Sequence, residues 1–325
     1  MKRASLFLLI ILSTLNIFAA NNQKQYKKLI EAYDVADEVK GIETNSPAEF
    51  WSVMLKNNEP YLKFAEDIKK GKGAEKEALE YTAQLPHLSH DNENIISRRQ
   101  SFCDSLLSNT GIAGLNLNCS LYLINSNEIN AYTALTDDGF AICLTTGLLN
   151  REGMTNDILT GYIANGFVHG ALNHHTRVFY DFARQRRKNA IYGGFTVGFA
   201  GIPINVGAML TKPAKLPSEN DHDDSEDIIE STRTYCFDYT QAQIFEADLI
   251  AYRFLDNLGR GDDYIDGLRI LGKEYDDLYA DFDNRPTVES RIEFLEFVRD
   301  NPQLGNTKNA GLRIKRLQKA RKNKK

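Results

Sequence analysis

Apolar residues recur at the three- and four-residue spacing of amphipathic helices through the first third of the chain. Pro47, Pro60, Pro86 and several glycines separate the periodic segments. These segments are Gln25–Ala36, Ala48–Leu55, Tyr61–Lys69 and Ala74–Ala83. The pattern predicts a helical N-terminal region over residues 21–112.

Short apolar runs of strand character follow from about residue 115. They are Ser120–Ile124, Ala131–Leu135 and Phe140–Leu144. The turn Asp137-Asp138-Gly139 separates the last two, and such a turn joins antiparallel strands. Helical spacing then returns over Asn156–Arg187, which predicts one long helix, and over Tyr239–Leu258. The whole pattern predicts an α+β fold, mainly helical with a small antiparallel sheet.

The first twenty residues have the pattern of a secretory signal peptide. Lys2 and Arg3 form a basic start, Ser5–Phe18 is apolar, and Ala19-Ala20 offers small residues for cleavage. The apolar run is shorter than the ~20 residues that a membrane-spanning helix needs. We therefore expect residues 1–20 to be removed and the remainder to be extracytoplasmic, in the periplasm or secreted.

Three further segments depart from the globular pattern. Residues 191–210 carry no charge, but glycines and Pro203 interrupt them, which favours an apolar lid or a membrane-surface contact over a spanning helix. Residues 218–230 hold seven acids, which is typical of a solvated loop. Residues 301–325 form a basic tail without an acid, either a soluble helix end or a contact for anionic lipid.

The net charge bears on the class of binding partner. Removing Lys2 and Arg3 from the 39 basic residues leaves 37 against 44 acidic residues, a net charge of −7. That balance gives no reason to expect nucleic acid as a partner.

Four cysteines allow three complete pairings in an oxidising compartment. Cys103 with Cys119 is the favoured pair because it closes a short loop; buried free thiols, with Cys143 and Cys236 among them, are the alternative.

Five motifs occur in a fixed order from about residue 115 onward. They are Asn130-Ala131-Tyr132, Thr146-Gly147-Leu148-Leu149, Ala164-Asn165-Gly166-Phe167-Val168-His169, Glu246-Ala247-Asp248, and Arg285-Pro286-Thr287 with Arg291-Ile292. Together they resemble motifs of the zinc metallopeptidase family that includes HtpX and the CAAX prenyl proteases. The family's versions read Asn-Ala-Phe, Thr-Gly-Leu-Leu, Ala-His-Glu-x-x-His, Glu-x-x-Ala-Asp and His-Pro-x-x-x-x-Arg-Ile. The resemblance implies a zincin-like metallopeptidase domain over residues 113–300.

The family's chemistry requires three zinc ligands and a general base. Two His one helical turn apart and a Glu from a second helix bind the metal, and a Glu beside the first His takes a proton from the bound water. The ligand positions here hold Asn165, His169 and Ile244, and the base position holds Gly166. Only His169 is retained, so we expect no bound cofactor. The resemblance also places Asp248 beside the site.

Neighbouring side chains do not replace the lost ligands if the helices are straight. His174 and His175 lie ~140° and ~240° round the helix from His169, so we expect them at a solvated helix end. Glu246 lies ~200° round from Ile244 and should also point away. A rebuilt zinc site would therefore need ligands from elsewhere, such as His222 or the acidic segment.

Three further residues can be interpreted from their chemistry. Gly166 costs ~1 kcal/mol in a helix relative to Ala, so a helix built only for packing has little reason to carry it. We expect Arg291 to form a structural ion pair and Asp248 to orient a neighbour.

Three functions are compatible with these residues. The first is a catalytically inactive relative, a pseudopeptidase, that binds protein or peptide partners in the cell envelope. The resemblance places such a partner beside an edge strand of the hairpin, here Phe140, Ile142 and Cys143. The second is an active zinc metalloendopeptidase with a rebuilt metal site. The third is a structural or regulatory envelope protein.

Overall fold

The N-terminal region is a series of helices, as its periodicity predicts. In this computed structural model the described residues are 22–43, 46–191, 234–282, 285–302 and 304. Residues 22–33 are helical, and they are followed by α2 (Ala36–Val39), α3 (Pro47–Asn57), α4 (Glu59–Lys70), α5 (Ala74–Thr82) and α6 (Gln100–Asn109). Pro47 and Pro60 lie in the first turns of α3 and α4, where a missing N–H costs nothing. The Asn58 side chain accepts from the N–H of Tyr61 and caps α4.

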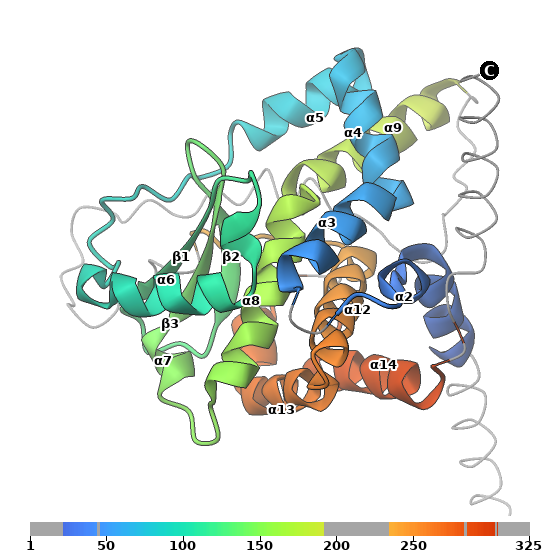
Figure 1. The fold of residues 1–325 in the computed structure, drawn as a ribbon. Coiled ribbons are helices and arrows are strands. Elements are labelled where there is room, and N and C mark those ends of the chain that lie inside the picture. Colours follow the sequence, from blue (N-terminus) through green and yellow to red (C-terminus); the bar gives the residue numbers. More distant parts are fainter. Residues whose placement is uncertain (1–21, 44–45, 192–233, 283–284, 303, 305–325) are drawn as a thin grey trace, which may run out of the picture.

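A three-stranded mixed sheet follows the helices (Figure 1). It contains β1 (Cys119–Ile124), β2 (Ala131–Leu135) and β3 (Phe140–Thr145) in the order β1-β3-β2. The predicted hairpin is confirmed, because β2 pairs with β3 in antiparallel register. The prediction of an antiparallel sheet is wrong in one respect, since β1 runs parallel to β3.

The position of β3 corrects the predicted partner groove. Phe140, Ile142 and Cys143 belong to the central strand, which pairs on both sides, and every residue of β3 is buried. An uninterrupted apolar run is typical of a strand covered on both faces, so the run itself indicated a central position. An extended peptide therefore cannot add to β3. The sheet edges are β1 and β2.

Helices α8 and α12 form the centre of the second half of the chain (Figure 1). This half comprises α7 (Thr146–Leu149), α8 (Asn156–Ala171), α9 (His174–Ile191), α12 (Gln241–Asn257), α13 (Gly261–Leu278) and α14 (Val288–Asp300). Helix α8 packs against β2 and β3 on one side and against α12 and α13 on others. The α+β prediction is therefore confirmed, with helices predominating.

The predicted long helix over 156–187 is broken at residues 172–173. Helix α8 ends at Ala171, and Asn173 has a φ of 52°, in the left-handed region that a continuing helix cannot adopt. Asn tolerates this conformation better than most residues. The chain therefore changes direction before His174, which begins α9.

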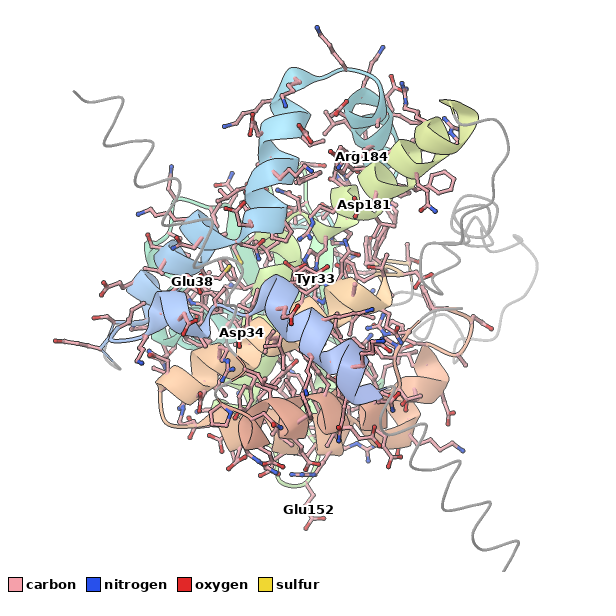
Figure 2. All side chains as sticks on the ribbon, turned by 90° about the vertical axis from the view of Figure 1, so that its right-hand side faces the viewer. Tyr33, Asp34, Glu38, Glu152, Asp181 and Arg184 are labelled. Atoms are coloured by element: carbon pink, nitrogen blue, oxygen red, sulfur yellow. The ribbon has the colours of Figure 1, made fainter. Side chains whose placement is uncertain are left out.

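A buried ion pair attaches the first helix to α12. Asp34 follows the helical residues 22–33 and lies beside them in Figure 2. Arg253 of α12 donates to both of its carboxylate oxygens, from Nε at 2.9 Å and from Nη2 at 2.7 Å. One cluster of buried apolar side chains extends from Tyr26 to Val298. The N-terminal helices thus share a core with the helices that carry the predicted site.

All four cysteines are free thiols, which corrects the favoured Cys103–Cys119 pairing. Cys103 is buried on α6 and packs in the main core, where a thiol behaves as a small apolar side chain. Within the described residues, none of the helices is both long and apolar enough to cross a membrane. The predicted signal peptide, the acidic segment 218–230, and nearly all of the apolar segment 191–210 and the basic tail lie outside those residues.

Candidate functional site

The positions that the resemblance assigns to the zinc site gather around one cavity. Helix α8 contributes Asn165, Gly166 and His169, and α12 contributes Ile244. The other lining residues are Ala131, Tyr132, Thr133, Phe237, Tyr239, Tyr275, Tyr279, Arg285 and Arg291. The cavity offers about 20 Å³ to the centres of water molecules, which is room for about one. The predicted positions therefore converge, although they lie on different helices.

His169 is buried and held between two aromatic neighbours. Its Nδ1 lies 3.0 Å from Nδ1 of His174, so one ring donates the shared proton and the other accepts it. The ring of Tyr239 stacks on His169 with 3.9 Å between centroids. Burial, reinforced by the charges of nearby His and Arg side chains, holds the pKa of His169 well below its usual value. His169 is therefore a neutral, hydrogen-bonded histidine of the core.

The break between α8 and α9 brings His174 and His175 into the site. Both side chains are buried, which corrects the prediction of a solvated helix end. The rotation calculated for a continuous helix does not apply, because the left-handed φ of Asn173 interrupts the helix. The Tyr239 hydroxyl lies 3.0 Å from Nε2 of His175. Burial lowers the pKa of His175 to about 3, so this ring is also neutral.

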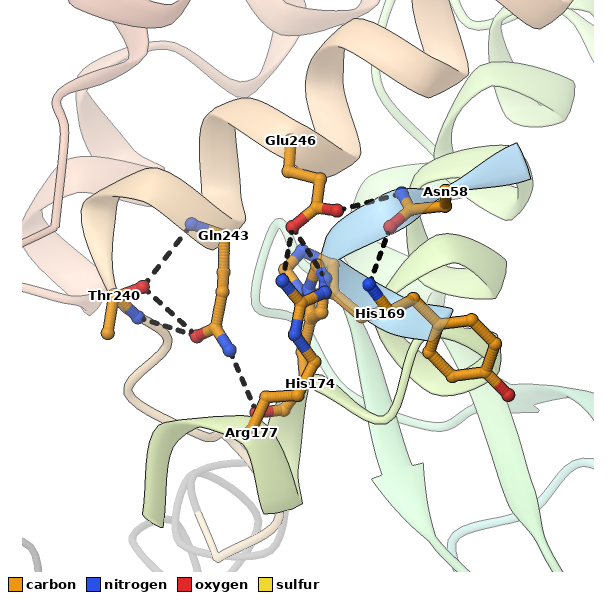
Figure 3. Close-up of polar contacts among 8 residues, drawn as sticks. Asn58, His169, His174, Arg177, Thr240, Gln243 and Glu246 are labelled. Atoms are coloured by element: carbon orange, nitrogen blue, oxygen red, sulfur yellow. Dashed lines mark hydrogen bonds and ion pairs between the residues drawn. The ribbon is translucent and has the colours of Figure 1, made fainter. Parts of the chain in front are cut away.

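The Glu246 carboxylate lies in a buried polar network. Figure 3 shows its carboxylate between Asn58 of the α3–α4 junction and two residues of α9. Asn58 Nδ2 donates to Oε1 at 3.0 Å, and Arg177 Nη2 forms an ion pair with Oε2 at 3.1 Å. His174 Nε2 lies 3.4 Å from Oε2, a close contact without good hydrogen-bond geometry. Glu246 does not line the cavity that Ile244 lines, as the rotation along the helix predicts, and its partners lie on α9 and at the α3–α4 junction.

The charge of Glu246 is stabilised although the carboxylate is fully buried. Burial raises its pKa, but Arg177, His174 and Asn58 together outweigh burial and lower the pKa to about 2. Arg177 and Asn58 lie far apart in the sequence, on α9 and at the α3–α4 junction. Sequence reasoning missed both, because neither belongs to a motif. The one signal in the sequence was Glu246 itself, which lies among apolar residues of a helix. A buried Glu requires hydrogen-bond or charge partners.

The start of α12 is fastened to the start of α9 by a second set of hydrogen bonds (Figure 3). Thr240 and Gln243 form a reciprocal capping box at the N-terminus of α12. The amide of Gln243 also donates to the backbone carbonyl of His174 at 3.1 Å. Both helix starts are therefore fixed relative to each other and to the histidines.

Asp248 orients Asn165 and Arg291, as predicted. Arg291 donates to both carboxylate oxygens of Asp248, each at 2.8 Å, so the predicted ion pair is confirmed. Asn165 Nδ2 donates to Oδ1 at 2.9 Å, and the Tyr264 hydroxyl donates to the same oxygen at 2.7 Å. The amide at the first ligand position is thus turned toward Asp248.

Gly166 has a packing role that the sequence did not reveal. A Cβ at this position would lie 2.9 Å from Cγ2 of Ile142 and 3.2 Å from Oγ1 of Thr133. Its carbonyl also accepts from the Thr133 hydroxyl at 2.8 Å. Helix α8 approaches the sheet so closely here that only glycine fits. The expectation that packing gives no reason for a glycine is therefore wrong.

No metal-binding group emerges from the part of the chain that the structure describes. Within those residues, no three or more His, Cys, Asp or Glu side chains are arranged to hold an ion. His222 and the acidic segment, the suggested sources of a rebuilt site, lie outside them. No protein-family model matches the sequence, and no curated protein matches it either.

Proposed function

We propose that this protein is a non-catalytic relative of the zinc metallopeptidases that binds protein or peptide partners in the cell envelope. The observation that carries the proposal is the cavity at Asn165, His169 and Ile244. The positions expected to hold zinc lie together, yet two of the three side chains there cannot serve as good ligands. The position of the general base is occupied by a glycine against Ile142.

Electrostatics around His169 also favour a site without zinc. Two guanidinium groups, those of Arg285 and Arg291, line the same cavity and disfavour a divalent cation. The nearest acid to Arg291, Asp248, is already paired with it. A zinc ion at His169 would have neither a carboxylate ligand nor a free base within that wall.

One observation favours the alternative of an active zinc endopeptidase. His169 and His174 face each other through their Nδ1 atoms, and Glu246 lies behind His174. A metal between the two rings would displace the shared proton and retain Glu246 as a partner of the second ring. We rank this function second because Arg177 already neutralises Glu246. A structural or regulatory envelope protein is the remaining alternative.

A groove beside the site is the place where a peptide would bind. It has a volume of about 490 Å³, within the range of ligand-binding clefts. Its walls come from α4, the segment before β1, the turn between β2 and β3, and the α8–α9 junction; they include Tyr61, Asn116, Leu117, Asn118 and Asn173. Amide groups beside an exposed Leu117 offer hydrogen bonds and an apolar contact to an extended chain.

Peptide binding can be tested with a matched pair of leucine variants. Leu117 and Leu79 are both exposed, at 38% and 44%, but only Leu117 lines the groove. In a fluorescence-anisotropy titration with unfolded casein, Leu117→Asp should weaken binding by roughly tenfold, about 1.4 kcal/mol. Leu79→Asp should leave the affinity unchanged.

The outcomes separate the three functions. Binding of casein without cleavage, with an affinity that Leu117→Asp weakens and Leu79→Asp does not, supports the proposal. Cleavage of casein that a chelator abolishes would instead support the zinc endopeptidase. Absence of binding by the wild-type chain would favour the structural or regulatory role.

A further inference from the structure

Two arginines, one buried and one partly exposed, converge on one tyrosine at the cavity. Arg285 precedes α14, where the motif that it resembles has His, and Arg291 lies within α14. Their guanidinium carbons lie 5.3 Å and 5.7 Å from the ring centroid of Tyr275 on α13. All three residues line the cavity. Two like charges thus flank a single ring at the cavity.

Only one of these charges has a carboxylate partner. Asp248 pairs with Arg291. Arg285 donates from Nη2 to the Tyr275 hydroxyl at 2.5 Å and stacks over the ring of Tyr279 at 3.6 Å. No ion pair joins Arg285 to an acid in the described part of the chain. A buried charge without a counter-charge is costly, so this wall favours an incoming anion.

Unfilled hydrogen-bond donors remain on both guanidinium groups. Nε of Arg285 and Nη1 of Arg291 are buried atoms that find no hydrogen-bond partner among the residues that the structure describes. Arg291 as a whole is 4% exposed; Arg285 is partly exposed, although its Nε is not. The Tyr275 hydroxyl accepts from Arg285, which leaves its own hydrogen to donate. These donors suit an acceptor with two oxygens, since guanidinium and carboxylate groups match in geometry.

We propose that the cavity binds a carboxylate group between Arg285 and Arg291. The small free volume limits the part that enters to the carboxylate itself. The group can come from a small free acid or from the end of a peptide. The proposal does not depend on peptide binding in the groove, because its residues lie on α13, α14 and the segment before α14.

Formate is the smallest probe of this site. We expect sodium formate to raise the melting temperature of the full chain, relative to sodium chloride at equal ionic strength and pH 7.5. The rise should grow with the logarithm of the formate concentration above its Kd and reach about 5 °C at a hundredfold excess over the Kd. Arg285→Gln should abolish the difference between the two salts, whereas Arg299→Gln, on the exposed side of α14, should retain it.

The readout is the difference between salts within each variant, so a lower starting stability does not obscure it. If Arg285→Gln does not fold, Tyr275→Phe keeps the ring and removes one donor, and it should reduce the formate effect. Equal effects of formate and chloride on the wild type would overturn the proposal, as would an undiminished formate effect in both Arg285→Gln and Tyr275→Phe.

A second arm distinguishes the two sources of the carboxylate. A trialanine peptide with a free C-terminus is compared with its C-terminal amide in the same assay. Stabilisation by the free acid beyond that by formate assigns the site to peptide ends, and stabilisation by formate alone assigns it to small acids. Equal stabilisation by the free acid and the amide, without a formate effect, would overturn carboxylate recognition.

Discussion

At the scale of residues, the contacts of His169 determine whether the cavity could bind a metal ion. A zinc ligand must offer a nitrogen lone pair, but the Nδ1 of His169 shares a proton with His174 at 3.0 Å. Tyr239 covers one face of the ring. His169 is therefore part of a hydrogen-bonded core of neutral imidazoles.

The buried histidines should make the protein sensitive to mild acid. The folded-state pKa values of His169, His174 and His175 all lie below 6.5, chiefly because of burial. Their contribution to stability is complete above pH 6.5 and is lost as the pH falls toward the folded-state values. Each group can contribute about 1.4 kcal/mol per pH unit to this loss.

Urea unfolding between pH 7.5 and pH 5 measures this loss. His175→Gln should flatten the dependence of the unfolding free energy on pH, and His87→Gln, at an exposed position, should not. A stability that is constant over this range in the wild type would contradict the neutral, buried state of the three rings.

Replacement of Gly166 by Ala should destabilise the protein despite the better helix propensity of Ala. Propensity favours Ala by ~1 kcal/mol, but the new methyl meets the stiff Ile142 side chain at 2.9 Å, and overpacking costs ~1–3 kcal/mol. We expect a net loss of about 1 kcal/mol by urea unfolding. Gly114→Ala is the control, because its Cβ would lie 3.9 Å from Ala48. A more stable Gly166→Ala protein would show that α8 can move away from the sheet.

At the scale of elements, the turn between α8 and α9 determines the composition of the site. The periodicity of residues 156–187 predicts a continuous helix. Helical spacing alone does not reveal that two residues, 172 and 173, interrupt it. Asn173 was the local signal, since Asn is enriched in the left-handed region. Without this break, His174 could not contact His169.

Substitution at Asn173 tests the importance of this conformation. The residue is exposed and has a φ of 52°. Asn173→Gly should leave the unfolding free energy within about 0.5 kcal/mol. Asn173→Ala should lower it by about 1 kcal/mol, because Ala lacks the short polar side chain that lets Asn tolerate positive φ. Equal stability of the two variants would mean that the turn can relax.

The sheet illustrates which pairings a sequence reveals. The β2–β3 hairpin follows from a local turn signal at Asp137-Asp138-Gly139, and the structure confirms it. The parallel pairing of β1 with β3 joins Cys119 to Phe140 without any local signal. Non-local pairing is decided by the packing of the whole core, so the central position of β3 was not predicted from the hairpin.

At the scale of the molecule, the sequence predicted which backbone positions meet but not what surrounds them. Asn165, His169, Ile244 and Arg291 line one cavity, as motif order implies. The polar network around Glu246 draws on Asn58 and Arg177, which no motif connects to the site. Such partners become visible only when the N-terminal helices are packed against α12 and α9.

The ion pair between Asp34 and Arg253 should be essential to that packing. Both side chains are buried, and removal of one partner leaves an uncompensated charge. Asp34→Ala should lower the unfolding free energy by about 3–5 kcal/mol. Asp262→Ala, which breaks the exposed pair with Arg299, should cost less than about 1 kcal/mol. Similar losses in both variants would contradict the attachment of the first helix through Asp34.

Metal content is the most direct test of the proposal that this site binds no zinc and catalyses no cleavage. Residues 21–325 are expressed, dialysed against zinc-containing buffer and then against buffer alone, and examined by elemental analysis together with casein cleavage. We expect far less than one zinc per chain, no cleavage, and no change in either quantity on His169→Ala substitution. One zinc per chain, lost together with chelator-sensitive cleavage in His169→Ala, would contradict the proposal of a non-catalytic protein.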